Sequence, residues 1–227
     1  MENQEKASRV IDTLTGPFEK KYLPKMAAAL PAWVNPDHLT VLGIFAAIVI
    51  GAGYLLTWQS IHWLWLSNAG LILHWYADSL DGTLARVRHI ERERYGYFVD
   101  HICDAITVLF LCFGLGLSPL MNLNVAMLLI ITYFLLNIYV HIMAYAQNEF
   151  RLSYSKIGPT EVRIIVFLLN TGIFIWNPTS VEYRGHTLTA LDIGGLIIAG
   201  IFFIVFVAVS IKDAIKLDKQ DRAKLNK

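Results

Sequence analysis

The chain has 227 residues, of which 56% are hydrophobic and only 16% charged, and its formal net charge is +1. This composition is too apolar for an ordinary soluble domain. We therefore expect a membrane protein, with the membrane rather than a nucleic acid as its partner.

The first 36 residues are charged and contain no short apolar core or small-residue cleavage site, so we expect no signal peptide here. Their apolar residues recur at roughly helical spacing, with Lys20, Lys21 and Lys25 among them. This pattern predicts an amphipathic helix over residues 5–30 that lies along the cytoplasmic membrane surface. A flexible basic arm is the alternative for this segment (residues 1–36).

Two long tracts, residues 38–77 and 105–148, carry no Asp, Glu, Lys or Arg. A membrane span needs about 20 predominantly apolar residues, so each tract can hold two spans. Shorter uncharged runs at 164–181 and 193–211 can hold one each. We therefore predict an all-α membrane bundle over residues 37–211, followed by a basic cytoplasmic tail over 212–227. The six predicted spans are 39–57, 61–85, 97–117, 121–146, 161–178 and 191–211.

The basic residues are distributed asymmetrically across this predicted topology. With six spans, the N-terminal segment, the loops 86–95 and 147–163, and the C-terminal tail lie on one side of the membrane. They contain 18 of the 19 Lys and Arg residues, and only Arg184 falls on the other side. By the positive-inside rule, both ends of the chain are expected in the cytoplasm.

At the end of the predicted second span the chain reads DSLDGTLAR from residue 78, and near the start of the third it reads DHICD from residue 100. On helices, Asp78 and Asp81 share one face, and so do Asp100 and Asp104. A short connection makes these helices antiparallel neighbours, so four carboxylates can converge at the cytoplasmic boundary. Because uncompensated charges at membrane depth are costly, bound Mg²⁺, Mn²⁺ or Ca²⁺ is expected.

The alternative is a solvated loop in which these acids pair with the nearby arginines. That interpretation suits Glu91 and Glu93, which flank Arg92. It suits the four aspartates poorly, because their spacing is the one that a shared helix face requires.

These residues resemble the signature of the CDP-alcohol phosphotransferase family, DxxDGxxAR followed by a spacer and GxxxDxxxD. The hydropathy pattern extends the resemblance over nearly the whole chain. The spacer, Val87 to Tyr95, has nine residues where the family usually has eight, and Asp37 replaces the Asn of a Pro-Asn-x-x-Thr stretch before the first span. The matching motif positions are Asp78, Asp81, Gly82, Ala85, Arg86, Gly96, Asp100 and Asp104.

The resemblance implies an enzyme that transfers a substituted phosphate from a CDP-linked alcohol to a hydroxyl acceptor and releases CMP. It implies two Mg²⁺ or Mn²⁺ ions held by the four aspartates, a lipid substrate in the bilayer, and a homodimer. The positions expected to bind the CDP group are Asp37, Thr40, Gly82, Ala85, Arg86 and Gly96. Small residues at Gly82 and Ala85 leave room for a cytidine ring, although helix packing also explains them.

Two stretches resemble the choline- and ethanolaminephosphotransferase branch. DHICD is similar to its DHGCD, in which the His is the proposed base, and KIGPTEVR (156–163) is similar to its DVTEVQ stretch. The resemblance implies that His101 removes the acceptor proton and that Glu161 orients His101. The alternatives are interhelical hydrogen bonding for His101 and helix N-terminal capping for Glu161.

The substrates stay open at this point. The other branch of the family uses a CDP-diacylglycerol donor and a small polar acceptor. In that branch Asp104 or a bound hydroxide would be the base. Lys156 and Arg163 could then hold a phosphate-bearing headgroup. A cation transporter and a membrane pyrophosphatase are less favoured, since a transporter would place its acids near the midplane.

Overall fold

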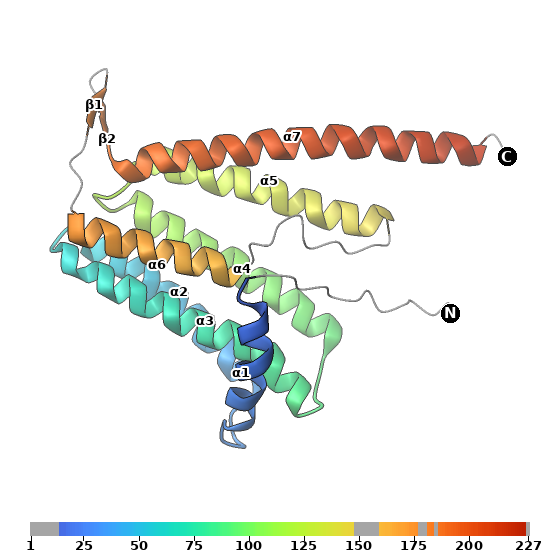
Figure 1. Cartoon of the computed structure of the whole chain (residues 1–227), viewed down its shortest axis with the longest axis horizontal. Coiled ribbons are helices and arrows are strands. Elements are labelled where there is room, and N and C mark those ends of the chain that lie inside the picture. The colour runs from blue at the N-terminus through green and yellow to red at the C-terminus, as the bar shows by residue number, and fades with distance from the viewer. Residues whose placement is uncertain (1–13, 148–158, 177–180, 184–185, 226–227) are drawn as a thin grey trace.

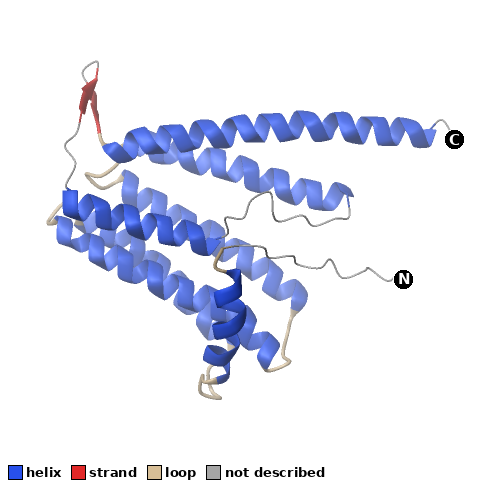
Figure 2. Cartoon of the chain, viewed as in Figure 1, coloured by secondary structure: helices blue, strands red, loops and turns tan. Residues whose placement is uncertain are grey.

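The computed structural model describes residues 14–147, 159–176, 181–183 and 186–225 (Figure 1). Its elements are almost all helices, with one short hairpin (Figure 2). The helices are α1 (Gly16–Ala28), α2 (Pro36–Leu56), the 3-10 turn η1 (Ile61–Trp63), α3 (Leu64–Val87), α4 (Glu93–Gly116), α5 (Leu123–Gln147), α6 (Pro159–Trp176) and α7 (Ala190–Leu225). The hairpin pairs β1 (Val181–Tyr183) with β2 (His186–Leu188) in antiparallel register.

Five helices of the described chain are long and apolar enough to cross a membrane: α2, α4, residues Leu123–Ala144 of α5, α6 and α7. Each coincides with a predicted span. The remaining predicted span, 61–85, forms the 24-residue helix α3. At 1.5 Å per residue, α3 is about 36 Å long, which is sufficient for a bilayer.

Helix α3 is less apolar than these five helices because it contains polar residues, several of which are buried against other helices. The Ser67 hydroxyl donates to the Ile50 carbonyl of α2 at 2.9 Å. The Asn170 amide of α6 donates to Asn68 at 2.8 Å, and the Tyr54 hydroxyl donates to Asn170 at 3.0 Å. These bonds satisfy the polar groups internally, as a membrane interior requires.

Three details differ from the sequence prediction. The hairpin was not predicted, and it is the exception to the all-α class. Helix α7 runs without a break across position 211 to Leu225, so residues 212–225 continue the last helix. Helix α1 spans Gly16–Ala28, so residues 14–15 and 29–30 of the predicted 5–30 helix are not helical, and residues 5–13 lie outside the described residues.

Small residues bring α2, α3 and α4 into close contact. A Cβ atom added at Gly53 would lie 2.5 Å from the Ser67 backbone nitrogen, and one added at Gly51 would lie 2.9 Å from the Phe110 carbonyl oxygen. A Cβ at Gly70 would lie 3.0 Å from the Ile50 nitrogen. The backbones therefore approach as closely as in other small-residue helix contacts of membrane proteins.

The start of α7 is fixed by a buried carboxylate. Asp192 is 1% exposed and accepts the backbone N–H of Asn122 at 2.6 Å and of Thr189 at 2.8 Å. The Thr189 hydroxyl donates to the Leu120 carbonyl at 2.7 Å. These bonds hold α7 to the turn between α4 and α5.

We expect Gly53→Ala to destabilise the protein by about 1–3 kcal/mol, the usual cost of overpacking, because the new methyl group meets backbone atoms that cannot move aside. Thermal unfolding in detergent measures the change. Gly200→Ala in α7 is the matched control, since a Cβ there meets nothing within 4 Å. An equal effect of both substitutions would contradict this account of the packing.

Candidate active site

The DSLDGTLAR segment forms the last turns of α3, and its side chains divide between two sides of the helix. Leu80 and Leu84 are fully buried in a cluster with Leu23 and Ala27 of α1. Asp78 and Asp81 are half-buried and lie near α4 and α6. The aspartates therefore stand on a helix whose other side is packed against α1.

Helix α3 ends in a Schellman motif. The N–H of Ile90 bonds to the Ala85 carbonyl at 3.0 Å, and that of His89 bonds to the Arg86 carbonyl at 3.2 Å. His89 has a φ of 55°, the left-handed conformation that this motif requires. The Arg88 guanidinium donates to carbonyl oxygens of the turn between α1 and α2, which belong to Leu30, Pro31, Ala32 and Val34.

The four aspartates lie near one another between α3 and α4. Asp104 interacts electrostatically with the other three. Asp81 interacts in the same way with Asp78 and Asp100. The four carboxylates are thus near enough to repel one another, and the metal site expected from the sequence stays a prediction.

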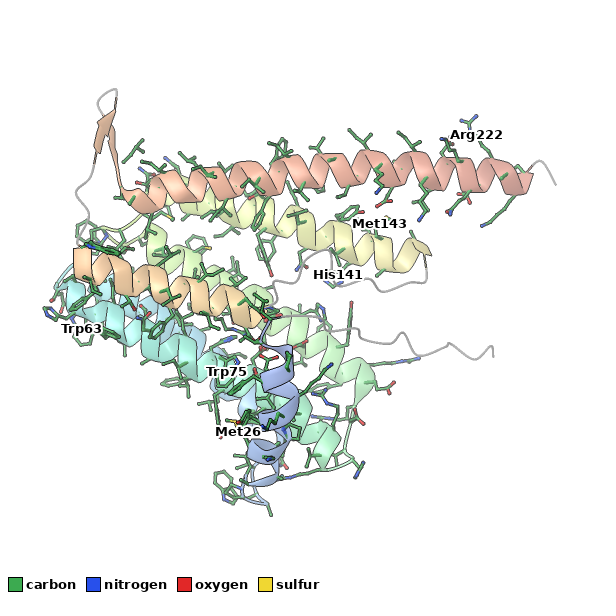
Figure 3. All side chains as sticks on the ribbon, viewed as in Figure 1. Met26, Trp63, Trp75, His141, Met143 and Arg222 are labelled. Atoms are coloured by element: carbon green, nitrogen blue, oxygen red, sulfur yellow. The ribbon has the colours of Figure 1, made fainter. Side chains whose placement is uncertain are left out.

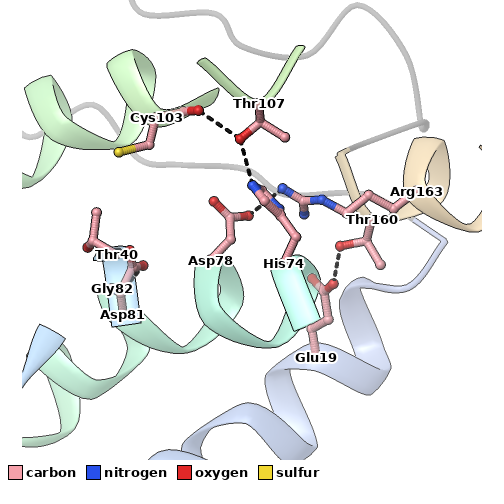
Figure 4. Close-up of polar contacts among 10 residues, drawn as sticks. All are labelled: Glu19, Thr40, His74, Asp78, Asp81, Gly82, Cys103, Thr107, Thr160 and Arg163. Carbon is pink, nitrogen blue, oxygen red and sulfur yellow. Dashed lines mark hydrogen bonds and ion pairs between the residues drawn. The ribbon is translucent and has the colours of Figure 1, made fainter. Parts of the chain in front are cut away.

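Asp78 and Asp81 each have a hydrogen-bond partner on another helix. The Arg163 guanidinium of α6 donates to Asp78 at 2.8 Å, as Figure 4 shows. The Thr40 hydroxyl of α2 donates to Asp81 at 3.0 Å. Within the described residues no three His, Cys, Asp or Glu side chains are arranged to hold one ion.

The donor chemistry nevertheless fits a divalent cation. Four mutually repelling carboxylates supply the hard oxygen atoms that Mg²⁺ and Mn²⁺ prefer. Arg163 also interacts electrostatically with Asp104, so its guanidinium stands beside two of the four acids. One arginine neutralises only part of this negative charge, which leaves the site complementary to added cations.

The remaining motif positions lie on α2, α3 and α4. Arg86 folds back to donate to the Thr83 hydroxyl at 3.0 Å, and a Cβ at Gly82 would lie 3.4 Å from the Arg86 guanidinium. Ala85 is half-buried, whereas Gly96 is exposed and a Cβ there would meet nothing within 4 Å. Asp37 forms an ion pair with Arg92 of the spacer.

His101 lies on α4 between Asp100 and Asp104, within an aromatic cluster. Its Nδ1 is 2.7 Å from the Tyr97 carbonyl oxygen, which can only accept. Nδ1 therefore carries a hydrogen, so that the lone pair of the neutral ring is on Nε2. The His101 ring centroid lies 4.2 Å from that of Tyr97 and 5.0 Å from that of His141, and the Tyr97 hydroxyl is 3.1 Å from His141 Nδ1.

Glu161 is only 6% exposed, and the structure places it beside α1. It accepts hydrogen bonds from the Thr15 N–H at 2.8 Å and from the Thr15 hydroxyl at 2.9 Å. Its pairing with His101, expected from the family resemblance, is not among the contacts of the described residues. Lys156, the other expected headgroup residue, lies outside them.

The structure brings to the aspartates a residue that was not among the predicted site residues. His74, one turn before Asp78 on α3, is buried, and its Nε2 lies 2.8 Å from the Thr107 hydroxyl of α4. That hydroxyl donates to the Cys103 carbonyl at 2.8 Å, so Nε2 of His74 is the donor to Thr107 (Figure 4). The contact joins α3 and α4 next to the aspartates. The spacing of four residues between His74 and Asp78 was the available signal.

Comparison with known proteins identifies the family. The model of the CDP-alcohol phosphatidyltransferase family matches residues 33–211, which include all four aspartates. The chain belongs to the CDP-alcohol phosphatidyltransferase family. The resemblance predicted from the motif is confirmed, and together with the five apolar helices it identifies an integral membrane protein.

Similar curated proteins are cholinephosphotransferases. The chain is 26% identical to cholinephosphotransferase 1 of Bos taurus over 66% of its own length and 39% of the relative. It is 26% identical to the Danio rerio protein of that name, over 74% of this chain and 46% of the relative. It is 25% identical to the Gallus gallus protein of that name, over 83% of this chain and 58% of the relative. These similarities confirm the predicted likeness to the choline and ethanolamine branch, although the matches cover only about two fifths to three fifths of these relatives.

Proposed function

We propose that this protein is a phospholipid-synthesis enzyme that transfers phosphocholine or phosphoethanolamine from a CDP-linked donor to diacylglycerol. The observation that carries the proposal is the convergence of four aspartates from α3 and α4, within a family of CDP-alcohol transferases. In the reaction, the acceptor oxygen forms a bond to the phosphorus that bears the alcohol. The bond from that phosphorus to CMP breaks, and the acceptor proton passes to a base.

The family depends in general on divalent metals. Asp78, Asp81, Asp100 and Asp104 would hold two Mg²⁺ or Mn²⁺ ions. When bound, the ions would neutralise negative charge on the pyrophosphate and on the departing CMP. Arg163 would then leave Asp78 and become available to a phosphate oxygen, which its forked donors suit.

His101 is the candidate base. Because Nδ1 is bound to the Tyr97 carbonyl, Nε2 can accept the proton of the acceptor hydroxyl. Asp104 is the alternative base, one helical turn away. We propose that Glu161 acts as a positioning residue, holding the start of α6 in place through Thr15.

The proposed topology has six spans, with α3 as the second. This topology places both ends of the chain and the aspartates in the cytoplasm. It is supported by the basic residues, 18 of 19 of which fall on that side. The expected homodimer stays a proposal that rests on the family resemblance.

A donor screen tests the proposed reaction. We expect the purified protein, in vesicles containing diacylglycerol and Mg²⁺, to form phosphatidylcholine or phosphatidylethanolamine and CMP when given CDP-choline or CDP-ethanolamine. Mass spectrometry measures the lipid product, and a separate assay measures the CMP released. Folded Asp81→Asn is the inactive control. CMP release that needs no lipid acceptor would indicate a pyrophosphatase. A lipid product that forms only from CDP-diacylglycerol together with a small polar alcohol would indicate the other branch.

The role of His101 gives a second prediction. His101→Ala should reduce the transfer rate about 10²- to 10⁴-fold, the usual range for a lost general base, while CDP-alcohol affinity changes little because the aspartates remain. His62→Ala is the matched control, since His62 is an exposed residue of η1, at the other end of α3. If His101→Ala stays within a few-fold of the unmodified enzyme, another group removes the proton, and a CDP-diacylglycerol donor becomes the better proposal.

A further inference from the structure

Helix α1 has an outward face that combines apolar and basic side chains. Leu14, just before the helix, is 75% exposed, Phe18 is 53% exposed and Tyr22 is 40% exposed. Lys21 and Lys25 are exposed on the same side of the helix, and the Lys21 ammonium lies 5.4 Å from the Tyr22 ring centroid. Apolar rings flanked by lysines are typical of a helix that lies in the headgroup region of a membrane.

The charge of α1 favours an anionic lipid surface. Its single acidic residue, Glu19, is turned away from this face and accepts a hydrogen bond from the Thr160 hydroxyl of α6 at 2.6 Å (Figure 4). The lysines of the face therefore have no acid within α1 to neutralise them. The end of α7 is different, since Arg222 and Lys224 pair with Asp218 and Asp221.

The opposite face of α1 is packed against the catalytic segment of α3. Leu23 and Ala27 belong to the same buried cluster as Leu80 and Leu84. These two leucines lie in the segment of α3 that also carries Asp78 and Asp81. Figure 3 shows Met26 and Trp75 at the crossing of the two helices, and both pack against this cluster. A shift of α1 would therefore reach the backbone that carries the aspartates.

The N-terminal end of α1 is bonded to α6. Thr15 donates twice to Glu161, and Glu19 accepts from Thr160, so four residues form a junction between the two helices. Two residues beyond Glu161, Arg163 reaches Asp78. Helix α1 thus contacts both helices that contribute to the Asp78–Arg163 pair.

We propose that the outward face of α1 docks on anionic lipid headgroups, and that this docking positions the aspartate cluster through the contacts of α1 with α3 and α6. The effect on catalysis rests on the proposed transferase function. The docking itself does not.

The experiment compares the full chain in phosphatidylcholine vesicles with the chain in vesicles that also contain about 30 mol % phosphatidylserine, a strongly anionic composition, and both kinds of vesicle contain the acceptor diacylglycerol and Mg²⁺. Amide hydrogen exchange over residues 16–28 reports docking, and CMP formation from CDP-choline reports activity. At about 1 kcal/mol for each lysine near an anionic surface, two lysines predict exchange about 30-fold slower with phosphatidylserine. The rate of CMP formation should rise at least several-fold.

Two sets of variants separate docking from coupling. Lys21→Gln with Lys25→Gln should abolish the phosphatidylserine effect on both exchange and rate, whereas the control Lys219→Gln with Lys224→Gln in α7 should retain both. Thr15→Val with Thr160→Val should keep the slower exchange and lose most of the rate increase, because both hydroxyl bonds between α1 and α6 are removed and only the Thr15 N–H bond to Glu161 remains.

Exchange over 16–28 that is the same in both vesicles would overturn the docking. Slower exchange with an unchanged rate, in an enzyme that forms CMP, would overturn the coupling. If neither vesicle supports CMP formation, the proposed transferase function fails and the coupling proposal fails with it, and the exchange result alone decides whether α1 docks on anionic lipid.

Discussion

Mutual repulsion among four carboxylates at the ends of α3 and α4 is the constraint around which this structure is organised. Asp104 interacts electrostatically with the other three aspartates in the half-buried space between the helices, where charge is costly. The protein offsets part of that cost with Arg163 on Asp78 and with the Thr40 hydroxyl on Asp81. The remaining negative charge makes the site complementary to divalent cations. Once bound, these cations would in turn attract the negatively charged pyrophosphate.

Holding the aspartates in place requires closely packed helices, and small residues provide them. Gly51, Gly53 and Gly70 allow the backbones of α2, α3 and α4 to approach until little space remains for a methyl group. The bond from His74 to Thr107 joins α3 to α4 directly beside the aspartates. Polar groups such as Asn68 and Asn170 are satisfied by one another, so a helix as polar as α3 can lie within the bundle.

Local patterns explain what the sequence could predict. The i+3 and i+4 spacing of Asp78 with Asp81 and of Asp100 with Asp104 determines a shared face, and uncharged tracts determine where long helices lie. Contacts between distant segments carry no such signal. Thr15 meets Glu161 across 146 positions, and no pattern around either residue indicates it. The sequence also did not predict the hydrogen bonds from Arg88 to the turn before α2, or the packing of α1 on Leu80, because these too are contacts between distant segments.

We predict that the aspartate cluster binds two divalent ions in each chain. Titration of the detergent-purified protein with Mn²⁺, followed by electron paramagnetic resonance of the free ion, measures this stoichiometry without a catalytic assay. Two saturable sites that Mg²⁺ displaces, and whose number or affinity falls in folded Asp81→Asn and Asp104→Asn, are the predicted result. Absence of saturable binding, or binding that is unchanged in both variants, would contradict the assignment of the metal site.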